Sequence, residues 1–172
     1  MRRTLLTAAV AVPLVHAAAV AGADERRAGF AVGARIVAGC TVATDAAGSW
    51  GQIDLGTVPG VTGQTATAGI AADGVSGLVV TCTPGTAATL RADLGQNAAG
   101  GQRRLRSGAA GSALPYALRV GDTAQPWGVQ AYALTFLPGV ARQTLPVSAT
   151  VVLPAMTAAG LYTDTVRITL SF

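Results

Sequence analysis

Two cysteines and one histidine set the chemistry that this sequence can carry. The cysteines are Cys40 and Cys82, and the only histidine among the 172 residues is His16, close to the N-terminus. Two thiols without further ligands do not make a zinc site, which as a rule takes four protein ligands. In an exported chain, an even number of cysteines favours a disulfide instead. We therefore expect Cys40 and Cys82 to be joined.

The other polar residues do not form a catalytic pattern. The serines have neither the Gly-x-Ser-x-Gly context of a nucleophile nor a histidine base near them. The 8 acidic residues lie near turns or strand ends, apart from the adjacent pair Asp24 and Glu25. No spacing brings two carboxylates together for acid–base catalysis. We expect a protein that is not an enzyme and that uses no cofactor and no metal.

An arginine cluster and a lone tryptophan are the candidate recognition features. Arg103, Arg104 and Arg106 belong to the motif RRLR within a glycine-rich stretch. The motif predicts either a solvated hairpin tip or a surface for an anionic polysaccharide or another subunit. Trp127 lies between a proline and a glycine, so it anchors a long loop or, like Tyr116, serves as an interface aromatic.

The N-terminus predicts export. A short basic segment precedes an Ala/Val/Leu run over Leu5–Val20, and the small residues Ala21–Ala23 follow. This order is typical of a secretory signal peptide, so we expect residues 1–23 to be removed by cleavage after Ala23, or earlier after Ala17. An uncleaved membrane anchor is the alternative, because the run has about the length of a spanning helix.

The basic charge of the chain depends largely on that segment. The formal net charge is +4 for the whole chain, and loss of Arg2 and Arg3 with the signal peptide lowers it to +2. A small excess of this kind does not indicate nucleic-acid binding. After cleavage we also expect no membrane span, since no later segment is long and apolar enough.

The two ends of the mature chain have alternating patterns typical of strands. From Thr165 to Phe172, apolar and polar residues alternate strictly, and Ala28–Ala38 alternates more weakly because many of its residues are small. Between them, short apolar runs are separated by Gly/Pro turns. These runs are 40–43, 53–58, 75–83, 87–94, 114–120, 132–137 and 145–153. With no helical period, the pattern predicts an all-β sandwich. Because the sequence ends on a core-facing strand, we expect that strand to find a neighbour earlier in the chain or in another molecule.

The order of several segments resembles the spore coat protein U domain family. The segments are Cys40–Val42, Asp54–Thr57, Val79–Gly85, Arg103–Leu105, Leu114–Leu118, Trp127–Gly128 and Ala159–Val166. The resemblance covers essentially the whole mature chain. Its most specific parts are the two cysteines and the closing motif Gly-x-Tyr-x-Asp-Thr-Val.

That family is similar to the subunits of archaic chaperone–usher pili, which implies an incomplete immunoglobulin-like β-sandwich that lacks its last strand and is completed by a donor strand. It implies a periplasmic chaperone, an outer-membrane usher and other pilus subunits, in a homo- or heteropolymer, as partners. It also implies export through the periplasm to the cell surface, where the pilus serves adhesion and biofilm formation.

The resemblance also implies roles for particular residues. Residues 24–38 would be an N-terminal extension that acts as the donor strand, and residues 39–172 the pilin-like domain, in which the disulfide is structural. The extension would place Phe30, Val32, Ala34 and Ile36 in a neighbour. The edge of the groove, contacted first by the chaperone and then by the donor, would be formed by Val166, Ile168, Leu170 and Phe172.

A second hypothesis is a monomeric secreted binding module. In that case the N-terminal strand would fold back to complete its own sandwich, and Arg103–Arg106 with Trp127 would form a ligand face.

Overall fold

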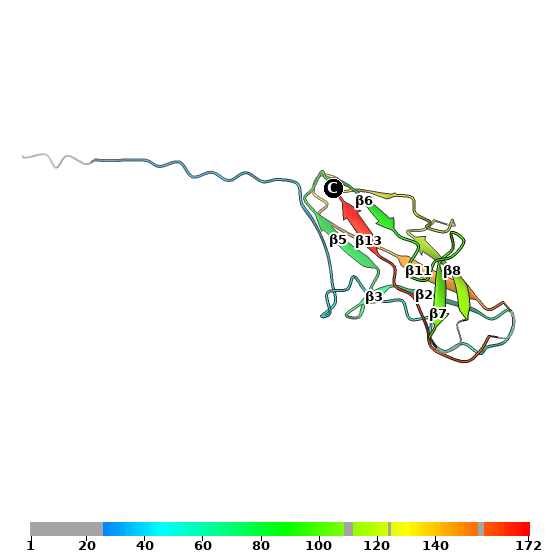
Figure 1. The fold of residues 1–172 in the computed structure, drawn as a ribbon. Coiled ribbons are helices and arrows are strands. Elements are labelled where there is room, and N and C mark those ends of the chain that lie inside the picture. The colour runs from blue at the N-terminus through cyan, green and yellow to red at the C-terminus, as the bar shows by residue number, and fades with distance from the viewer. Residues whose placement is uncertain (1–25, 109–111, 124, 155–156) are drawn as a thin grey trace, which may run out of the picture. The chain divides into compact units, whose positions relative to one another are not determined.

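The computed structural model describes residues 26–108, 112–123, 125–154 and 157–172 (Figure 1). Every helix or strand element in these ranges is a strand, so the all-β prediction is confirmed for the described chain. Within the same ranges no helix is long and apolar enough to cross a membrane. The expected signal peptide, residues 1–23, lies outside the described residues.

The chain consists of two units, Met1–Arg35 and Ile36–Phe172. In the described part of the first unit, residues 26–35, no residue belongs to a strand and every residue is exposed. The 13 strands that the structure describes all belong to the second unit. They are β1 (Cys40–Val42), β2 (Thr65–Gly69), β3 (Ala71–Ala72), β4 (Val75–Ser76), β5 (Leu78–Cys82), β6 (Ala87–Ala92), β7 (Arg104–Ser107), β8 (Ala113–Val120), β9 (Tyr132–Thr135), β10 (Arg142–Leu145), β11 (Val147–Val152), β12 (Tyr162–Thr163) and β13 (Ile168–Ser171).

Antiparallel pairing arranges the strands in four sheets. The largest has the order β12-β7-β8-β11-β2, two have three strands in the orders β1-β5-β10 and β13-β6-β9, and β3 pairs with β4 alone. β10 and β11 are separated only by Pro146. Because proline has no N–H to donate to a ladder, the chain changes partners there. β10 pairs with β5, whereas β11 pairs with β8 and β2, so this continuous segment links two sheets.

One main hydrophobic core lies among the sheets. Buried and more exposed side chains alternate along β6 and β11, as the period of two in a strand requires. The fully buried side chains include Leu78, Val80, Leu90 and Phe136. Partly buried apolar residues that pack against this cluster come mainly from β1, the stretch 50–55 and the C-terminal strand.

Several strand predictions differ from the structure, among them the run 75–83, which is divided into β4 and β5. Ala28–Ala38 is wrong as a strand of this chain, because the segment has no described pairing partner and a strand needs one to bond its backbone. The stretch 53–58 is wrong as well: Asp54 Oδ1 accepts a bond from Gly56 N at 2.8 Å, and Gly56 has a φ of +71°. An Asx turn with a left-handed glycine bends the chain out of a ladder.

The C-terminal strand is correct in type but shorter than predicted. The alternation over 165–172 predicted one strand, whereas β13 pairs with β6 only over Ile168–Ser171, and a separate short piece, β12, lies before the predicted range and pairs with β7. Between the pieces, residues 164–167 are bonded to the loop that follows β6.

Candidate functional site

β13 has one edge without a partner strand. Among the described strands it pairs only with β6 (Figure 1). β6 pairs in turn with β9 on its other side. Asp93 N donates a hydrogen bond to Arg167 O at 2.9 Å, so Arg167 directs its backbone carbonyl toward the β6 side. Along a strand, the backbone N–H and C=O groups of successive residues point alternately to one edge and to the other. Val166, Ile168 and Leu170 therefore direct their N–H and C=O groups to the open edge, where an added strand could bond to them.

The side chains of the same three residues are incompletely covered. Val166, Ile168 and Leu170 pack against the core but are only half-buried. Leu170 lies opposite Leu90 in the register of β13 and β6, and Leu90 is 0% exposed. Phe172, the fourth residue predicted for this edge, is 61% exposed. The edge therefore combines unpaired backbone groups with apolar side chains that another strand could cover.

The predicted donor residues are exposed. Phe30 has 88% of its surface exposed, and Val32 and Ile36 have 86% each. Ala34 is exposed as well. No strand pairing within the described chain joins these residues to Val166–Phe172. The structure thus describes two sets of alternating apolar side chains, one exposed and one half-buried.

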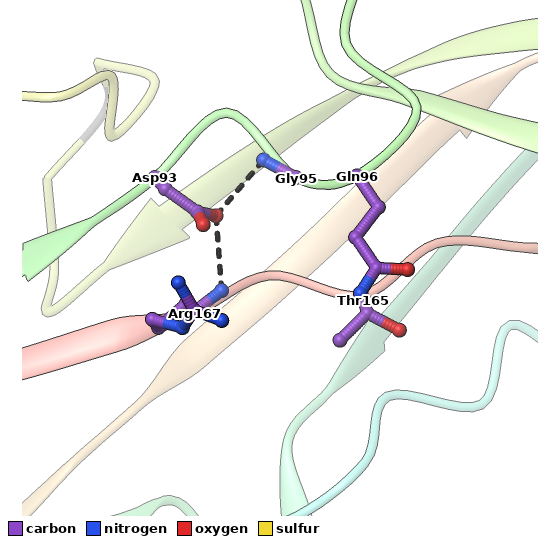
Figure 2. A pocket seen from close by; sticks show the side chains of 5 residues that line it. All are labelled: Asp93, Gly95, Gln96, Thr165 and Arg167. Carbon is purple, nitrogen blue, oxygen red and sulfur yellow. Dashed lines mark hydrogen bonds between the residues drawn. The ribbon is translucent and has the colours of Figure 1, made fainter.

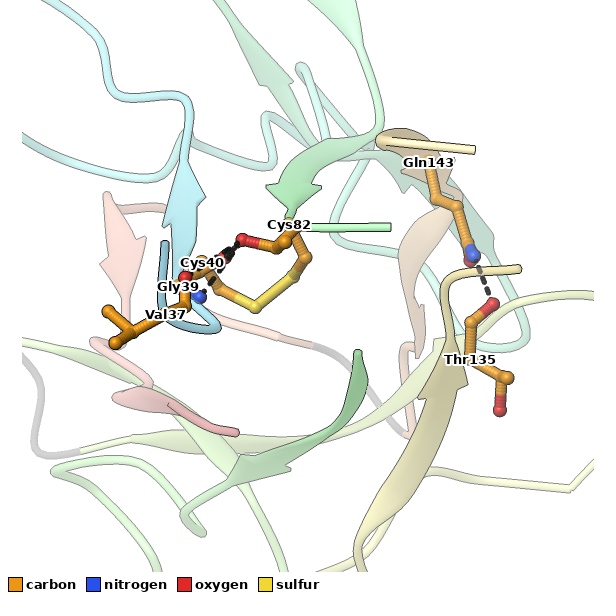
Figure 3. Close-up of a disulfide and its surroundings, with 7 residues drawn as sticks. Val37, Gly39, Cys40, Cys82, Thr135 and Gln143 are labelled. Carbon is orange, nitrogen blue, oxygen red and sulfur yellow. Dashed lines mark hydrogen bonds between the residues drawn. A yellow bond between two sulfur atoms is a disulfide. The ribbon is translucent and has the colours of Figure 1, made fainter. Parts of the chain in front are cut away.

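A disulfide holds the chain where the N-terminal segment ends. Cys40 and Cys82 are bonded with an S–S length of 2.04 Å and lie opposite each other in the pairing of β1 with β5, which confirms the predicted disulfide (Figure 3). Beside it, Thr83 N donates to Gly39 O at 2.9 Å, and Gly39 N donates to Thr83 Oγ1 at 3.2 Å. Covalent and hydrogen bonds therefore attach residues 39–40 to β5, directly after the exposed segment.

The arginine cluster is not a single surface. Arg103 is only 5% exposed, whereas Arg106, on β7, is exposed. Arg103 Nε donates to Asp93 O at 2.9 Å, Nη2 donates to Gly128 O at 3.0 Å, and Nη1 donates to Trp127 O. Burial lowers the pKa of this guanidinium. The prediction of a solvated tip is wrong for Arg103, which instead joins the loop after β6 to the loop at Trp127.

Trp127 is a packing residue. It is 2% exposed, and its Nε1 donates to Gln130 O at 3.0 Å within the same loop. This confirms the prediction that it anchors a long loop. With both Trp127 and Arg103 buried, the ligand face of the second hypothesis is wrong.

A partly buried hydrogen bond joins β8 to the closing motif. Tyr116 OH donates to Asp164 Oδ2 at 2.8 Å, and Asn97 N donates to Asp164 Oδ1 at 3.0 Å. Burial, followed by this bond to Asp164, raises the pKa of Tyr116. The sequence alone did not indicate this network. Its only signal was the aspartate inside the closing motif, because nothing in the spacing links residues 93, 116 and 164.

A small pocket lies where the C-terminal strand meets the loop after β6. Figure 2 shows its lining residues, Asp93, Gly95, Gln96, Thr165 and Arg167. No group of three or more His, Cys, Asp or Glu side chains within the described ranges could hold a metal ion.

Comparison with known proteins identifies a domain family and a fold. The family model described as the Spore Coat Protein U domain matches residues 27–169, so the match includes most of the N-terminal segment. No curated protein matches the chain.

Two solved structures are similar. One chain, from the CsuC–CsuE chaperone–tip adhesion subunit pre-assembly complex of archaic chaperone–usher Csu pili of Acinetobacter baumannii, has a TM-score of 0.51 and 20% identity, over 80% of this chain and 40% of that one. A chain described with a chaperone–tip adhesin complex of CFA/I fimbriae biogenesis has a TM-score of 0.48 and 19% identity, over 77% of this chain and 42% of that one. The chain thus spans less than half the length of either. The first likeness supports the predicted immunoglobulin-like β-sandwich.

Proposed function

Because the chain belongs to the Spore Coat Protein U domain family, we propose that it is an exported structural subunit of an archaic chaperone–usher pilus that polymerises by donor-strand exchange. The observation that carries this proposal is the pair of unmatched elements. β13 has an open edge with half-buried apolar side chains, and residues 28–38 form an exposed, alternating segment that pairs with no strand of the described chain. One copy of the chain has an element of each kind, so each copy can supply the strand that another lacks.

The N-terminal segment has the composition that such a strand requires. Phe30, Val32, Ala34 and Ile36 recur at every second residue, so in an extended conformation they all point to one side. On the acceptor, Val166, Ile168 and Leu170 recur with the same period. Burial of four such side chains would contribute on the order of 10 kcal/mol before the cost of ordering the segment. This free energy would drive assembly.

Exposed apolar edges also require a partner before assembly. An unpaired edge next to incompletely covered apolar side chains is a site of aggregation. A periplasmic chaperone would cover the edge with a strand of its own until an outer-membrane usher brings the next subunit. The assembled fibre would lie on the cell surface and serve adhesion and biofilm formation. In this proposal the protein is structural and catalyses no reaction.

Removal of residues 28–36 from the mature chain tests the proposal. We expect the purified chain to polymerise once it is free of chaperone, and the shortened chain to remain monomeric by size-exclusion chromatography. A synthetic peptide of residues 28–38 should bind the shortened chain, whereas a peptide of the same composition in scrambled order should not. Polymerisation of the shortened chain to the same extent would overturn the proposal.

A relocated segment distinguishes assembly from self-completion. We expect a chain in which residues 28–38 are moved behind Phe172 through a short flexible linker to be a monomer with a higher melting temperature, because the segment can then cover its own β13. If the natural chain is already a stable monomer with the same melting temperature, the N-terminal segment completes its own sandwich, as in the second hypothesis, and the subunit proposal fails.

A further inference from the structure

The segment between β12 and β13 is bonded to the loop after β6 along most of its length. The bonds involve Thr163 O with Asn97 Nδ2 at 3.0 Å, Asp164 Oδ1 with Asn97 N at 3.0 Å, Thr165 O with Gln96 N at 3.0 Å, and Arg167 O with Asp93 N at 2.9 Å. The start of the C-terminal strand therefore has a residue-specific attachment, before the regular ladder of β13 begins at Ile168.

Asp93 makes this attachment with its side chain as well as its backbone. In a regular ladder Arg167 N would donate to Asp93 O. Here Asp93 O accepts from Arg103 Nε at 2.9 Å and from Nη2 at 2.6 Å, and Arg167 N donates to Asp93 Oδ1 at 2.9 Å instead. The same carboxylate oxygen accepts from Gly95 N at 2.9 Å (Figure 2). The buried guanidinium of Arg103 thus donates to the Asp93 carbonyl. The Asp93 carboxylate takes the place of that carbonyl as the acceptor for Arg167 N.

Asp164 is fixed from both sides. One carboxylate oxygen accepts from Tyr116 on β8 and the other from Asn97 N. Gly95 lies directly beside the carboxylate at a φ of +82°, and a Cβ at this position would overlap Asp164 Oδ2. Only glycine fits there on both counts. The aspartate therefore has one position along the loop, and the strand that contains it cannot slide without breaking both bonds.

The apolar pattern of β13 does not prevent every error in its register with β6. A slip by one residue would turn Thr169 and Ser171 toward the core, so the alternation excludes it. A slip by two residues keeps apolar side chains inward, because Val166, Ile168, Leu170 and Phe172 are all apolar. Such a slip would shift every groove position by about 7 Å along the strand. It would also shift the half-buried apolar side chains of β13 relative to the donor side chains that they would receive.

We propose that Asp93 and Asp164 are positioning residues that exclude this two-residue slip and so determine where along β13 each donor side chain is received. The consequence for assembly rests on the proposed function, because the register of β13 matters for assembly only if a donor strand binds at its open edge. The register itself is a property of the single chain and can be measured without a donor.

Disulfide trapping measures the register directly. Arg91 lies opposite Thr169, and both are exposed, as is Ser171, two residues further along. The two native cysteines are bonded to each other, so introduced thiols are the only free ones. In the otherwise natural mature chain, R91C/T169C should form a bond on mild oxidation, and R91C/S171C or R91C/R167C should not. Peptide mapping by mass spectrometry identifies the bonded pair.

Removal of the two carboxylates should change that pattern. With Asp93→Ala and Asp164→Ala, singly or together, we expect trapping of R91C with S171C or R167C to rise at least tenfold. Asp93→Asn retains one oxygen for the bonds from Gly95 N and Arg167 N. Asp164→Asn retains an oxygen for Asn97 N, and its amide N–H can donate to Tyr116 OH. Both variants should restore the natural pattern. Leu90→Ala serves as the control for simple loss of stability, since it weakens the core without touching either carboxylate. It should trap only R91C with T169C.

The outcomes separate this proposal from the proposed function. If the alanine variants trap only R91C with T169C, or if Leu90→Ala slips as readily as they do, the positioning role is overturned. The second measurement is the affinity of the peptide of residues 28–38 for the chain lacking 28–36, which should fall at least tenfold with the alanine variants. If that peptide fails to bind even with both aspartates present, the proposed function fails, and the trapping result still decides the register.

Discussion

The segments Ala28–Ala38 and Val166–Phe172 have similar alternating sequences and different structures. The first has no strand and is exposed along its length, whereas the second pairs with β6 and packs its apolar side chains against the core. The difference lies in their surroundings. β13 comes directly after residues that are hydrogen-bonded to the loop after β6. The N-terminal segment is attached to the domain at its C-terminal end, through Gly39 and the disulfide.

This contrast shows what an alternating pattern specifies. It states which side chains would be buried together, but a strand forms only where another backbone is available to bond to it. The C-terminal strand has such a backbone on one side and the N-terminal segment has none in the described chain. Within the described chain, the C-terminal strand therefore lacks a strand partner on one edge, and the N-terminal segment lacks one on both. We expect substitutions in the N-terminal segment to affect assembly, and substitutions in the folded domain to affect its stability.

A charge in the N-terminal segment should give the largest effect. We expect Val32→Asp to abolish polymerisation, because assembly would place an unpaired carboxylate in an apolar groove. The stability of the monomer should stay within about 0.5 kcal/mol, since Val32 is 86% exposed. Light scattering reports the polymer, and urea unfolding reports the monomer.

Val37→Asp is the matched control. Val37 is also exposed, at 66%, but it belongs to the other side of the alternation. We expect this variant to polymerise. Equal loss of polymer in both variants would contradict the prediction that Val32, and not Val37, is on the side of the segment that enters the neighbouring subunit.

Loss of the disulfide should have the next largest effect, and it should act on the folded domain. The bond closes a loop with a sequence separation of 42 residues. Replacement of both cysteines by serine should lower the free energy of unfolding by about 4 kcal/mol in the chain-entropy model. It should also free the base of the N-terminal segment, because β1 pairs with β5 over only three residues. Urea unfolding with and without reductant provides the measurement, and equal midpoints would contradict the prediction.

The sequence predicted the fold class, the disulfide and most central strands because these depend on local patterns. Runs such as 87–94 alternate on their own, and β6 follows this one closely. The sequence also indicated both candidate segments of the site. It could not tell that one would be paired and the other not, since pairing depends on which backbones meet in three dimensions.

The polar network around Arg103 and Asp164 could not be predicted for a related reason. Arg103 appears in the sequence beside two other arginines, which is typical of a solvated turn. Its burial follows from carbonyls at residues 93, 127 and 128, which are brought together only by the fold. The link between Tyr116 and Asp164 spans 48 residues and leaves no periodic signal.

Alanine substitutions at two residues that face each other should sharpen the contrast between core and edge. Leu90 and Leu170 are register partners, but Leu90 is fully buried and Leu170 half-buried. We expect Leu90→Ala to lower the free energy of unfolding by about 3 kcal/mol and Leu170→Ala by about 1 kcal/mol. The order should reverse for the donor peptide of residues 28–38, because only Leu170 lies at the open edge. Peptide titration checks this, and equal losses of affinity would contradict it.

The smallest effect is a pH dependence of stability, which we expect to depend on the bond between Tyr116 and Asp164 and not on the N-terminal segment. Burial and the bond to Asp164 raise the pKa of Tyr116 in the folded chain, whereas an unfolded tyrosine titrates near 10. The protonated phenol therefore favours the folded state, so its contribution to stability is complete below about pH 10 and is lost as the pH rises toward the folded pKa.

We expect Tyr116→Phe to lower the free energy of unfolding by roughly 1 kcal/mol at pH 7–9. This difference from the natural chain should shrink above about pH 10, because there the natural chain loses the contribution that the variant lacks. Deletion of residues 28–36 should leave the alkaline profile of the monomer unchanged, since that segment has no strand partner in the described chain. Urea unfolding at a series of pH values provides the test. If the free energies of unfolding of the natural chain and Tyr116→Phe differ by a constant amount from pH 7 to pH 11, ionisation of Tyr116 does not affect the stability of the fold.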